Sequence, residues 1–482
     1  SSLSDNSSDL LGYGGPIRDT GVPNVFNVFD LDNAKKRATQ EGSEEMTQSI
    51  FASAEIGWKS MLYLTLTGRN DWASQLKGSN PTSFFYPSVG LSAVISEMVT
   101  LPKAIDYLKV RGSFSSVGTP YPRFLVQPTY SYDPTKQDWN AKTHYPIGKL
   151  KPERTDSWEI GVDGTFFKDF KVSGSFYYAN TYNQTFDPKI TVSSGYSTLY
   201  VQTGYVRNLG VEGLLSYGHT WRDFGWNSNF TFSWNKNKIV ELVKDYVHPE
   251  TGEIVNKDRL ELKGLGYTKF ILKEGGTLGD LYTNADFIRD DKGYIQIDKN
   301  GDVAKTDNLP DIKLGSVFPK ANLAWNNSFS YKGIYAGFQL SARLGGIVYS
   351  ATQAALDQYG VSEASAAARD RGGALVNGRS WVNAQQYYEI VATSSGLPQY
   401  YTYSATNLRL QEAHIGYTIP RKWLGNICDI NVSVVGRNLW MIYCKAPFDP
   451  ESVATTSNYY QGIDYFMMPS TRNIGFNVKF NF

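Results

Sequence analysis

The last ten residues read Asn473-Ile474-Gly475-Phe476-Asn477-Val478-Lys479-Phe480-Asn481-Phe482, and apolar and polar side chains alternate through the whole stretch. Successive side chains of a β-strand point to opposite faces, so this period of two predicts a strand. A strand of a soluble sandwich also alternates, but its inner face buries a mixed aliphatic core. Aromatic rings opposed to amides and a lysine are typical of a wall with lipid on one side and water on the other.

The same alternation recurs along the chain. Around residues 226–235, Trp226, Phe230, Phe232 and Trp234 are interleaved with Asn, Ser and Thr. Applied throughout, the pattern predicts about thirteen strands, near 48–58, 60–70, 85–96, 105–117, 155–167, 169–181, 205–221, 225–241, 319–331, 333–346, 405–419, 428–440 and 471–482. The alternation changes phase after Leu410, which predicts a β-bulge near Gln411–Glu412.

The connections between these strands alternate between short and long. Residues 167–169, 222–224 and 332–333 are tight links, whereas the long connections are 118–154, 182–204, 242–318, 347–404 and 441–470. Outer-membrane barrels have short periplasmic turns and long extracellular loops. We therefore expect an all-β fold, a transmembrane antiparallel β-barrel with every long connection on the extracellular side.

The direction of the strands also makes a prediction about the barrel wall. Counted back from the end of the chain, the strand near 48–58 starts outside, so residues 1–47 are expected in an extracellular loop segment, with a short strand near Val25–Phe29. A complete bacterial barrel has an even number of strands and starts and ends in the periplasm. An open set of strands would leave unpaired backbone groups in lipid. We therefore expect further strands from another piece of polypeptide.

Composition agrees with a membrane wall built of strands. Aromatic residues make up 14% of the 482 residues, and the mean hydropathy is −0.36, with no run of 18 apolar residues that would form a transmembrane helix. A formal net charge of +1 does not favour nucleic-acid binding, which usually needs a basic excess. The first residues have neither a basic start nor an apolar core, so they are not a signal peptide.

Several segments, taken in order, resemble the SusC-like (SusC/RagA) family of TonB-dependent outer-membrane transporters of Bacteroidetes. They are Thr67-Gly68-Arg69-Asn70-Asp71-Trp72, Leu150-Lys151-Pro152-Glu153-Arg154-Thr155, Trp158-Glu159-Ile160-Gly161, Asn208-Leu209-Gly210-Val211-Glu212, Leu408-Arg409-Leu410, Gly436-Arg437-Asn438-Leu439, Phe448-Asp449-Pro450-Glu451 and Pro469-Ser470-Thr471-Arg472. Two positions depart from the family pattern, since Leu209 stands where Lys or Arg is common and Ser470 falls within the usual Pro-Arg-Thr segment. Both lie at strand ends, so neither affects the expected fold.

The resemblance implies a larger machine. Family members have about 22 strands and an N-terminal plug whose TonB box couples transport to TonB, and a SusD-like lipoprotein covers the extracellular loops. Residues 48–482 would then be the C-terminal portion of the barrel, about thirteen of its strands, with the plug absent from this chain. Its partners would be the N-terminal remainder of the barrel with its plug, the lipoprotein, TonB and outer-membrane lipid. The resemblance also implies that the terminal aromatic strand, with Phe480 and Phe482, is the signal for membrane assembly.

Aromatic residues in the long connections are the candidate ligand contacts, because flat rings with hydroxyl groups stack on sugars or cover a peptide. They are Tyr130, Tyr132, Trp139, Tyr387, Tyr388, Tyr400, Tyr401, Tyr459 and Tyr460. Packing of loop against loop or against the lipoprotein is the alternative for each of them. Tryptophans at strand positions are expected instead in interfacial girdles; these are Trp58, Trp158, Trp226, Trp234, Trp325 and Trp440.

Enzymatic and metal sites are not predicted. The four histidines are scattered, with His219 and His414 expected on the barrel wall, and no nucleophile elbow or phosphate-binding loop occurs. Asp290-Asp291-Lys292-Gly293 and Asp298-Lys299-Asn300-Gly301-Asp302 allow a calcium interpretation, but hairpin turns are favoured because the bidentate Glu of an EF-hand is missing. Cys428 and Cys444 have no metal-binding spacing and are either a disulfide or two free thiols. No cofactor is expected.

We expect TonB-dependent uptake of a nutrient, an oligosaccharide or an oligopeptide. A passive porin or adhesin without energy coupling is the alternative, and a secreted lectin sandwich is a third. The sequence does not decide between the two kinds of cargo.

Overall fold

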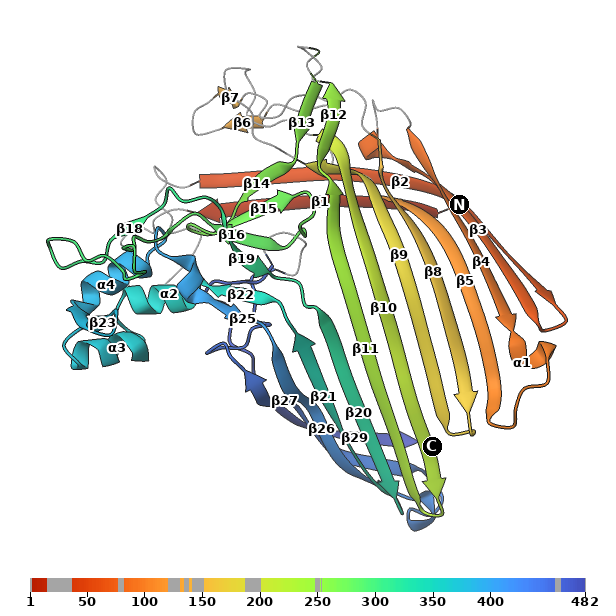
Figure 1. Cartoon of the computed structure of the whole chain (residues 1–482). Helices are drawn as coiled ribbons and strands as arrows, with labels where there is room; N and C mark the ends of the chain where they lie inside the picture. Colours follow the sequence, from red (N-terminus) through yellow and green to blue (C-terminus); the bar gives the residue numbers. More distant parts are fainter. Residues whose placement is uncertain are drawn as a thin grey trace.

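One large antiparallel sheet forms the body of the protein (Figure 1). The computed structural model describes residues 2–14, 37–76, 82–119, 131–133, 138–140, 151–186, 201–247, 252, 254–455 and 461–481. The sheet has 14 strands, and neighbours in the sheet follow the order of the chain. They are β1 (Ser2–Gly14), β2 (Arg37–Trp58), β3 (Leu62–Ala73), β4 (Ser83–Val94), β5 (Ile105–Thr119), β8 (Glu153–Phe166), β9 (Phe170–Phe186), β10 (Val201–Trp221), β11 (Phe224–Glu241), β20 (Ala321–Tyr331), β21 (Ile334–Leu344), β26 (Asn407–Ile419), β27 (Asp429–Cys444) and β29 (Asn473–Asn481).

All thirteen main strands predicted from the sequence are present in the large sheet, which contains one strand more. Residues 1–47 were expected as a loop, but Ser2–Gly14 form β1, which pairs with β2 from Ser2↔Ser49 to Gly14↔Arg37. The polar run at the start of the chain lacks apolar alternation, so its sequence does not predict a strand. This strand depends instead on backbone pairing with β2. The short strand expected near Val25–Phe29 lies outside the described residues.

The predicted alternation of short and long connections is confirmed. Tyr331 pairs with Ile334, and the two residues between them, Lys332 and Gly333, have φ of 44° and 91°. Positive φ at both central positions is the type I′ geometry that matches the twist of the flanking strands. In Figure 1 the tight turns lie at the lower right, and the long connections gather at the opposite end of the strands.

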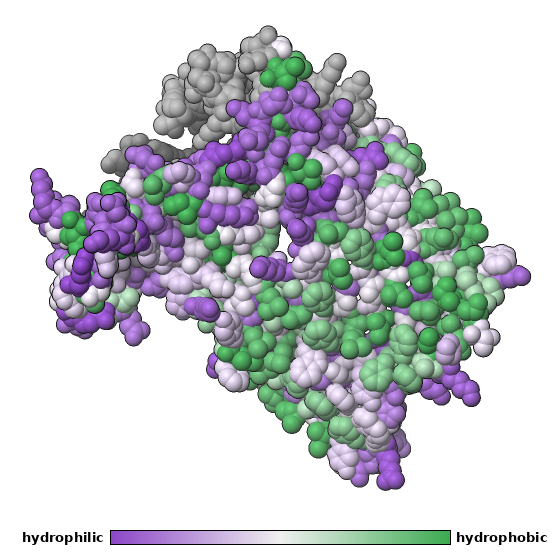
Figure 2. Space-filling view, viewed as in Figure 1, coloured by the Kyte–Doolittle hydropathy of each residue, from purple (hydrophilic) through white to green (hydrophobic). Residues whose placement is uncertain are grey.

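The two faces of the sheet differ as the period of two predicts. On β29 the side chains of Ile474 and Phe476 are 73% and 83% exposed, and apolar side chains on β8 and β27 are exposed in the same way. Figure 2 shows hydrophobic side chains over the middle of the strands, with hydrophilic ones toward both ends. Moving one such side chain from water into an apolar medium is worth about 1.5–3 kcal/mol, so this outer face is suited to contact with lipid.

The opposite, inner face is polar. The Arg111 guanidinium on β5 lies 2.5 Å from the Glu159 carboxylate and 3.5 Å from that of Asp163, both on β8. Ser173 on β9 donates a hydrogen bond to Asp163 at 2.6 Å. Such a surface is suited to water or to another polar surface.

Aromatic rings cluster on the outer face near the tight turns. The Trp226 indole donates to the Asn327 side-chain oxygen at 3.1 Å, and the Trp325 indole donates to Ser228 at 2.9 Å. Trp226 also stacks on Phe329 with ring centroids 6.5 Å apart. Rings with one polar atom are placed this way in the girdles that flank a membrane's apolar layer.

The predicted bulge and histidine positions are confirmed. Gln339 pairs with Glu412 and Leu340 with Leu410, so Gln411 is the extra residue in β26. His219 lies in β10 and His414 in β26, both on the wall.

The long connections have folded structure of their own, which the alternation pattern does not predict. One four-stranded sheet contains β14 (Arg259–Lys263), β15 (Lys269–Lys273), β16 (Asp280–Thr283) and β19 (Ile312–Ser316); a three-stranded sheet contains β25 (Thr402–Ser404), β22 (Ile347–Ser350) and β28 (Ile463–Asp464). Strand pairs are β6 (Ser131–Asp133) with β7 (Asp138–Asn140), β12 (Val243–Val247) with β13 (Ile254–Lys257), β17 (Asp286–Phe287) with β18 (Lys305–Thr306), and β23 (Ala374–Val376) with β24 (Ser380–Val382). Phe270, Leu281 and Val317 are fully buried among these connections, so they pack around a core separate from the wall.

Among the described residues, helices occur in the segments between strands of the main sheet. They are α1 (Ile95–Met98), α2 (Ala351–Gln358), α3 (Glu363–Asp370), α4 (Ala384–Val391), and the short 3₁₀ turns η2 (Ser74–Leu76), η4 (Pro398–Tyr401) and η5 (Arg421–Trp423). Within the described part of the chain, no helix combines the length and the apolar character needed to span a bilayer.

Candidate functional site

The connection between β21 and β26 builds a small helical unit at the rim of the long connections (Figure 1). Each of its helices begins at a polar cap, since the side chains of Ser350, Ser362 and Asn383 accept hydrogen bonds from backbone amides of α2, α3 and α4. Alanines fill the interiors of α2 and α3, and Ala has the highest helix propensity. Ser350 also donates to Asp464 at 2.6 Å, which ties the unit to β28.

A groove of about 790 Å³ runs between these helices, and tyrosines dominate its wall. Four of the nine predicted ligand contacts, Tyr387, Tyr388, Tyr400 and Tyr401, line it together with Tyr403. The Tyr387 and Tyr388 rings meet edge to face with centroids 5.2 Å apart. Residues that are far apart in the predicted loop therefore form one surface of rings.

Tyr401 is the most buried tyrosine of this surface. Its ring is 4% exposed, and its hydroxyl donates to the Asp357 carboxylate at 2.9 Å. Burial, followed by the neighbouring carboxylate, raises the pKa of Tyr401 well above its ordinary value, so the hydroxyl stays protonated and donating. The other oxygen of Asp357 accepts from Gln353 at 3.0 Å, so both oxygens have partners.

The remaining tyrosines are more accessible. Burial raises the pKa of Tyr387 to about 12, and the Tyr400 ring is 40% exposed. Tyr400 packs edge to face on Phe287, with centroids 5.3 Å apart, and its hydroxyl accepts from Arg289 at 3.3 Å. Partly exposed rings can stack on a ligand, and their neutral hydroxyls can donate hydrogen bonds to it or accept them from it.

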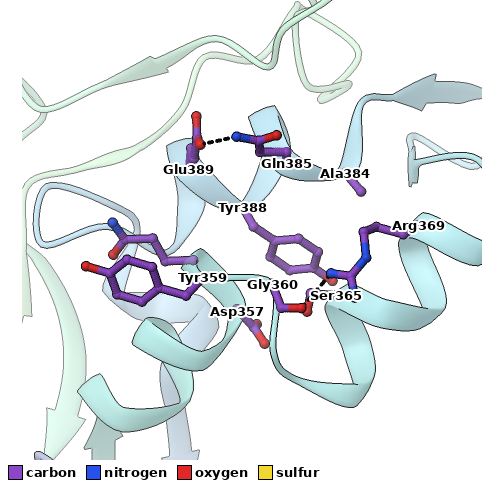
Figure 3. A pocket seen from close by; sticks show the side chains of 10 residues that line it. Asp357, Tyr359, Gly360, Ser365, Arg369, Ala384, Gln385, Tyr388 and Glu389 are labelled. Atoms are coloured by element: carbon purple, nitrogen blue, oxygen red, sulfur yellow. Dashed lines mark hydrogen bonds between the residues drawn. The ribbon is translucent and has the colours of Figure 1, made fainter.

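A second pocket of about 290 Å³ adjoins the groove, and Asp357 and Tyr388 line both (Figure 3). The Tyr388 ring points toward the Arg369 side chain, which donates to the Gly360 carbonyl at 2.5 Å. On α4, Gln385 donates to Glu389 at 2.8 Å. Sequence reasoning missed these charged residues because it treated the segment as a loop. The Ala-rich run with Ser350 and Ser362 before it is the helix signal that would have found them.

A buried ion pair anchors the last long connection to the wall. Arg409 on β26 makes two hydrogen bonds to the Asp449 carboxylate, at 2.8 and 3.1 Å, and their side chains are 5% and 9% exposed. Glu451 lies 3.3 Å from the same guanidinium and accepts from Asn407 at 3.1 Å. Burial acts to raise the pKa of Asp449, but hydrogen bonds from Arg409 and from the Glu451 amide outweigh it and lower that pKa.

The wall, its sidedness and the folded rim can be compared with known proteins. A family model described as TonB dependent receptor-like, beta-barrel, matches residues 3–439. The chain belongs to the TonB-dependent receptor family. The predicted kinship with SusC-like transporters is confirmed, and members of this family are outer-membrane barrel proteins.

Two curated relatives and one solved structure show how far the similarity of this receptor extends. TonB-dependent receptor P3 of Formosa agariphila is 24% identical over 464 residues, which are 90% of this chain and 45% of that protein. TonB-dependent receptor SusC of Bacteroides thetaiotaomicron is 23% identical over 263 residues, 49% of this chain and 26% of that protein. The match to the structure of the RagAB peptide transporter covers 100% of this chain and 52% of the chain in that structure. Its TM-score is 0.74 at 16% sequence identity, and this likeness shows the fold.

Coverage of the relatives is partial. The receptor chain spans about half the length of the curated relatives that it matches over most of its own length, 45% and 48%. The rest of those proteins has no counterpart in these residues.

Of the five other predicted ligand contacts of the receptor, the structure describes Tyr132 and Trp139. Tyr132 and Trp139 are paired in register across the β6–β7 hairpin. Tyr130, Tyr459 and Tyr460 lie outside the described residues, as does Phe482 of the predicted assembly signal. Phe480 lies on the outer face of β29 and is 54% exposed.

The two Asp-rich segments form hairpin turns, as the sequence favoured. The Asp290 side chain accepts from the amides of Lys292 and Tyr294, both at 2.9 Å. Asp298 accepts in the same way from Asn300 and Asp302, at 2.8 and 3.0 Å. One oxygen of each carboxylate is therefore occupied by turn amides.

Cys428 and Cys444 are free thiols. They lie at opposite ends of β27, which separates them by roughly 50 Å at 3.3 Å per residue. The disulfide alternative is wrong, because a bridge needs Cα atoms within about 7 Å.

Proposed function

We propose that this receptor forms much of the wall of an energised nutrient importer in the outer membrane of a Gram-negative bacterium. The observation that carries the proposal is the main sheet itself, which presents apolar side chains outward, polar ones inward, and its long connections at one end. In the proposed machine, a plug gates the lumen, TonB supplies the energy, and a SusD-like lipoprotein covers the long connections.

The sheet edges support a larger assembly. β1 and β29 stand at the two ends of the strand order, and each pairs on one side only within the described sheet. Unpaired backbone groups in lipid cost several kcal/mol each, so a stable wall needs further strands at both edges. We propose that the remainder of the barrel supplies them.

The tyrosine groove is the proposed contact for cargo. Its rings and hydroxyls suit either an oligopeptide or an oligosaccharide, and the peptide named for the RagAB transporter makes peptides the first class to test. The tyrosine rings and hydroxyls of the groove support the binding of such a ligand.

Uptake by living cells tests the proposal. Cells that carry the intact transporter would be given panels of fluorescent oligopeptides and oligosaccharides, with and without a protonophore. We expect saturable uptake of one class that stops when the proton motive force is removed. Uptake that is indifferent to the protonophore would support the passive porin instead and would overturn the proposal.

Two variants connect uptake to the groove. Replacing Tyr388 and Tyr400 with alanine should raise the half-saturating concentration roughly tenfold or more, since ring stacking is worth about 0.5–1.5 kcal/mol per pair. Trp381 provides the matched control, because its ring is 56% exposed in the same connection but does not line the groove. Equal effects of Y388A/Y400A and W381A would show that the groove does not hold cargo.

A further inference from the structure

Three cations lie on the outer face of the wall, on two neighbouring strands. Val211 of β10 pairs with Trp234 of β11, and both side chains belong to the apolar outer face. Arg207 stands four residues before Val211, and Lys236 and Lys238 stand two and four residues after Trp234. Because side chains alternate with a period of two, these three cations share the outer face with Val211 and Trp234.

The tryptophans of β11 indicate where these cations lie along the membrane normal. Trp226 and Trp234 are eight residues apart, which is about 27 Å along a strand and about 20 Å across a membrane at a tilt near 40°. The apolar band of an outer-membrane barrel is about 25 Å tall. Lys236 and Lys238 therefore stand just beyond the band, at the end where the long connections lie.

The register places like charges together. Arg207 and Lys238 occupy directly opposite positions on β10 and β11, an arrangement that is destabilising unless an anion offsets it. Among the ion pairs at 4.0 Å or less between described residues, none includes Arg207, Lys236 or Lys238.

The Arg207 side chain is held in place by neutral groups. Its guanidinium lies over the rings of Tyr178 and Tyr205, 5.1 and 5.5 Å from their centroids. It donates to the Tyr205 hydroxyl at 2.6 Å and to the Asn180 side-chain oxygen at 3.3 Å. The cation is thus ordered before any anion arrives, which reduces the entropy lost on binding.

The nearby carboxylates already have partners. Asp156, which pairs in register with Asn180, accepts from Arg154 at 2.8 Å. Glu241, at the end of β11, lies 3.8 Å from the Lys244 ammonium. The excess of three positive charges therefore remains at this level of the wall.

We propose that Arg207, Lys236 and Lys238 form a docking surface for the phosphate of a lipid headgroup in the outer leaflet of the membrane. A phosphate at this level offsets the opposed cations through charge-assisted hydrogen bonds. The acyl chains of the same lipid lie against the apolar side chains below, such as Val211. The proposal requires the sheet to sit in a membrane but does not depend on transport or its energy source.

Lipid binding to the intact, purified transporter tests the proposal. In native mass spectrometry, the protein in detergent would be titrated with lipid A that carries one phosphate and with the same lipid after removal of that phosphate. We expect the phosphorylated lipid to bind more tightly. K236Q/K238Q, which keeps the Arg207 contacts, should weaken that binding roughly thirtyfold. K236R/K238R should restore it.

The matched control removes two cations from the other rim. K168Q/K332Q changes residues of the tight turns and lowers the net charge equally, and it should leave binding within about threefold of the parent. Heat-modifiable migration on gels would confirm that every variant is folded. Equal losses in the two double variants, equal binding of both lipids, or displacement of the lipid by inorganic phosphate at the same concentration would each overturn the proposal.

Discussion

At the scale of single residues, the hydrogen bond from the Tyr401 hydroxyl to the Asp357 carboxylate connects η4 to α2 across the tyrosine groove. Tyr401→Phe would leave a buried carboxylate with one partner fewer, at a cost of about 1–3 kcal/mol. We expect amide hydrogens of α2 and η4 to exchange roughly 5- to 150-fold faster, as measured by mass spectrometry over residues 351–401. Tyr359→Phe is the control, because that ring is 75% exposed. Identical exchange in the two variants would contradict the structural role of Tyr401.

The Arg409–Asp449 pair makes a second prediction at this scale. Arg409→Ala would leave the Asp449 carboxylate buried without its cation, which typically costs about 3–5 kcal/mol. We expect residues 445–455 to become accessible to proteases while the wall stays assembled. Asp223→Ala removes one partner of an exposed pair, 3.6 Å apart, and should have little effect. Equal protease resistance of the Arg409 and Asp223 variants would refute this prediction.

The same pair has a pH dependence with a definite sign. Because the pKa of Asp449 is lowered in the folded protein, its stabilising contribution is present above the ordinary Asp value, about 3.9, and is lost as the pH falls through the lower folded value. Hydrogen exchange of residues 445–455 should therefore be unchanged between pH 7 and pH 5 after correction for intrinsic rates. It should accelerate below about pH 4. Acceleration on raising the pH instead would show that the sign is wrong.

At the scale of an element, we predict that the wall assembles only when β29 is present. Its backbone pairs with β27 from Asp429↔Asn481 to Arg437↔Asn473, so ending the chain before Asn473 would expose a new edge to lipid. We expect the truncated receptor to be absent from the outer membrane, as measured by surface labelling and fractionation. Normal surface levels would contradict this expectation.

A pair of point variants separates the faces of β29. Phe476→Arg places a charge on the lipid side, which costs about 2–4 kcal/mol near the middle of a membrane, whereas Asn477→Arg places it on the polar inner face. Surface levels should fall for the first variant and stay near the parent for the second. The reverse order would mean that the two faces are assigned the wrong way round.

For the molecule as a whole, the proposed closed wall makes a prediction about its edges. If further strands pair with β1 and β29 in the intact transporter, the amides of these strands should exchange as slowly as those of β10, which has neighbours on both sides. The β12–β13 hairpin, a two-stranded sheet of its own, serves as the fast-exchanging reference. Exchange of β29 at the rate of that hairpin would contradict closure.

The amino-acid sequence by itself determined the strands, their faces and the side on which the long connections lie. These properties follow from local alternation, as in Ile474 to Phe480 and in the phase change at Gln411, and alternation needs no knowledge of distant residues. β1 was missed because its polar residues do not alternate. Only the tertiary structure decided that Tyr387, Tyr388, Tyr400 and Tyr401 meet, that Arg409 pairs with Asp449, and that Arg207 faces Lys238. Each of those contacts joins residues on different elements, and strand register and helix packing, which no local period encodes, bring them together.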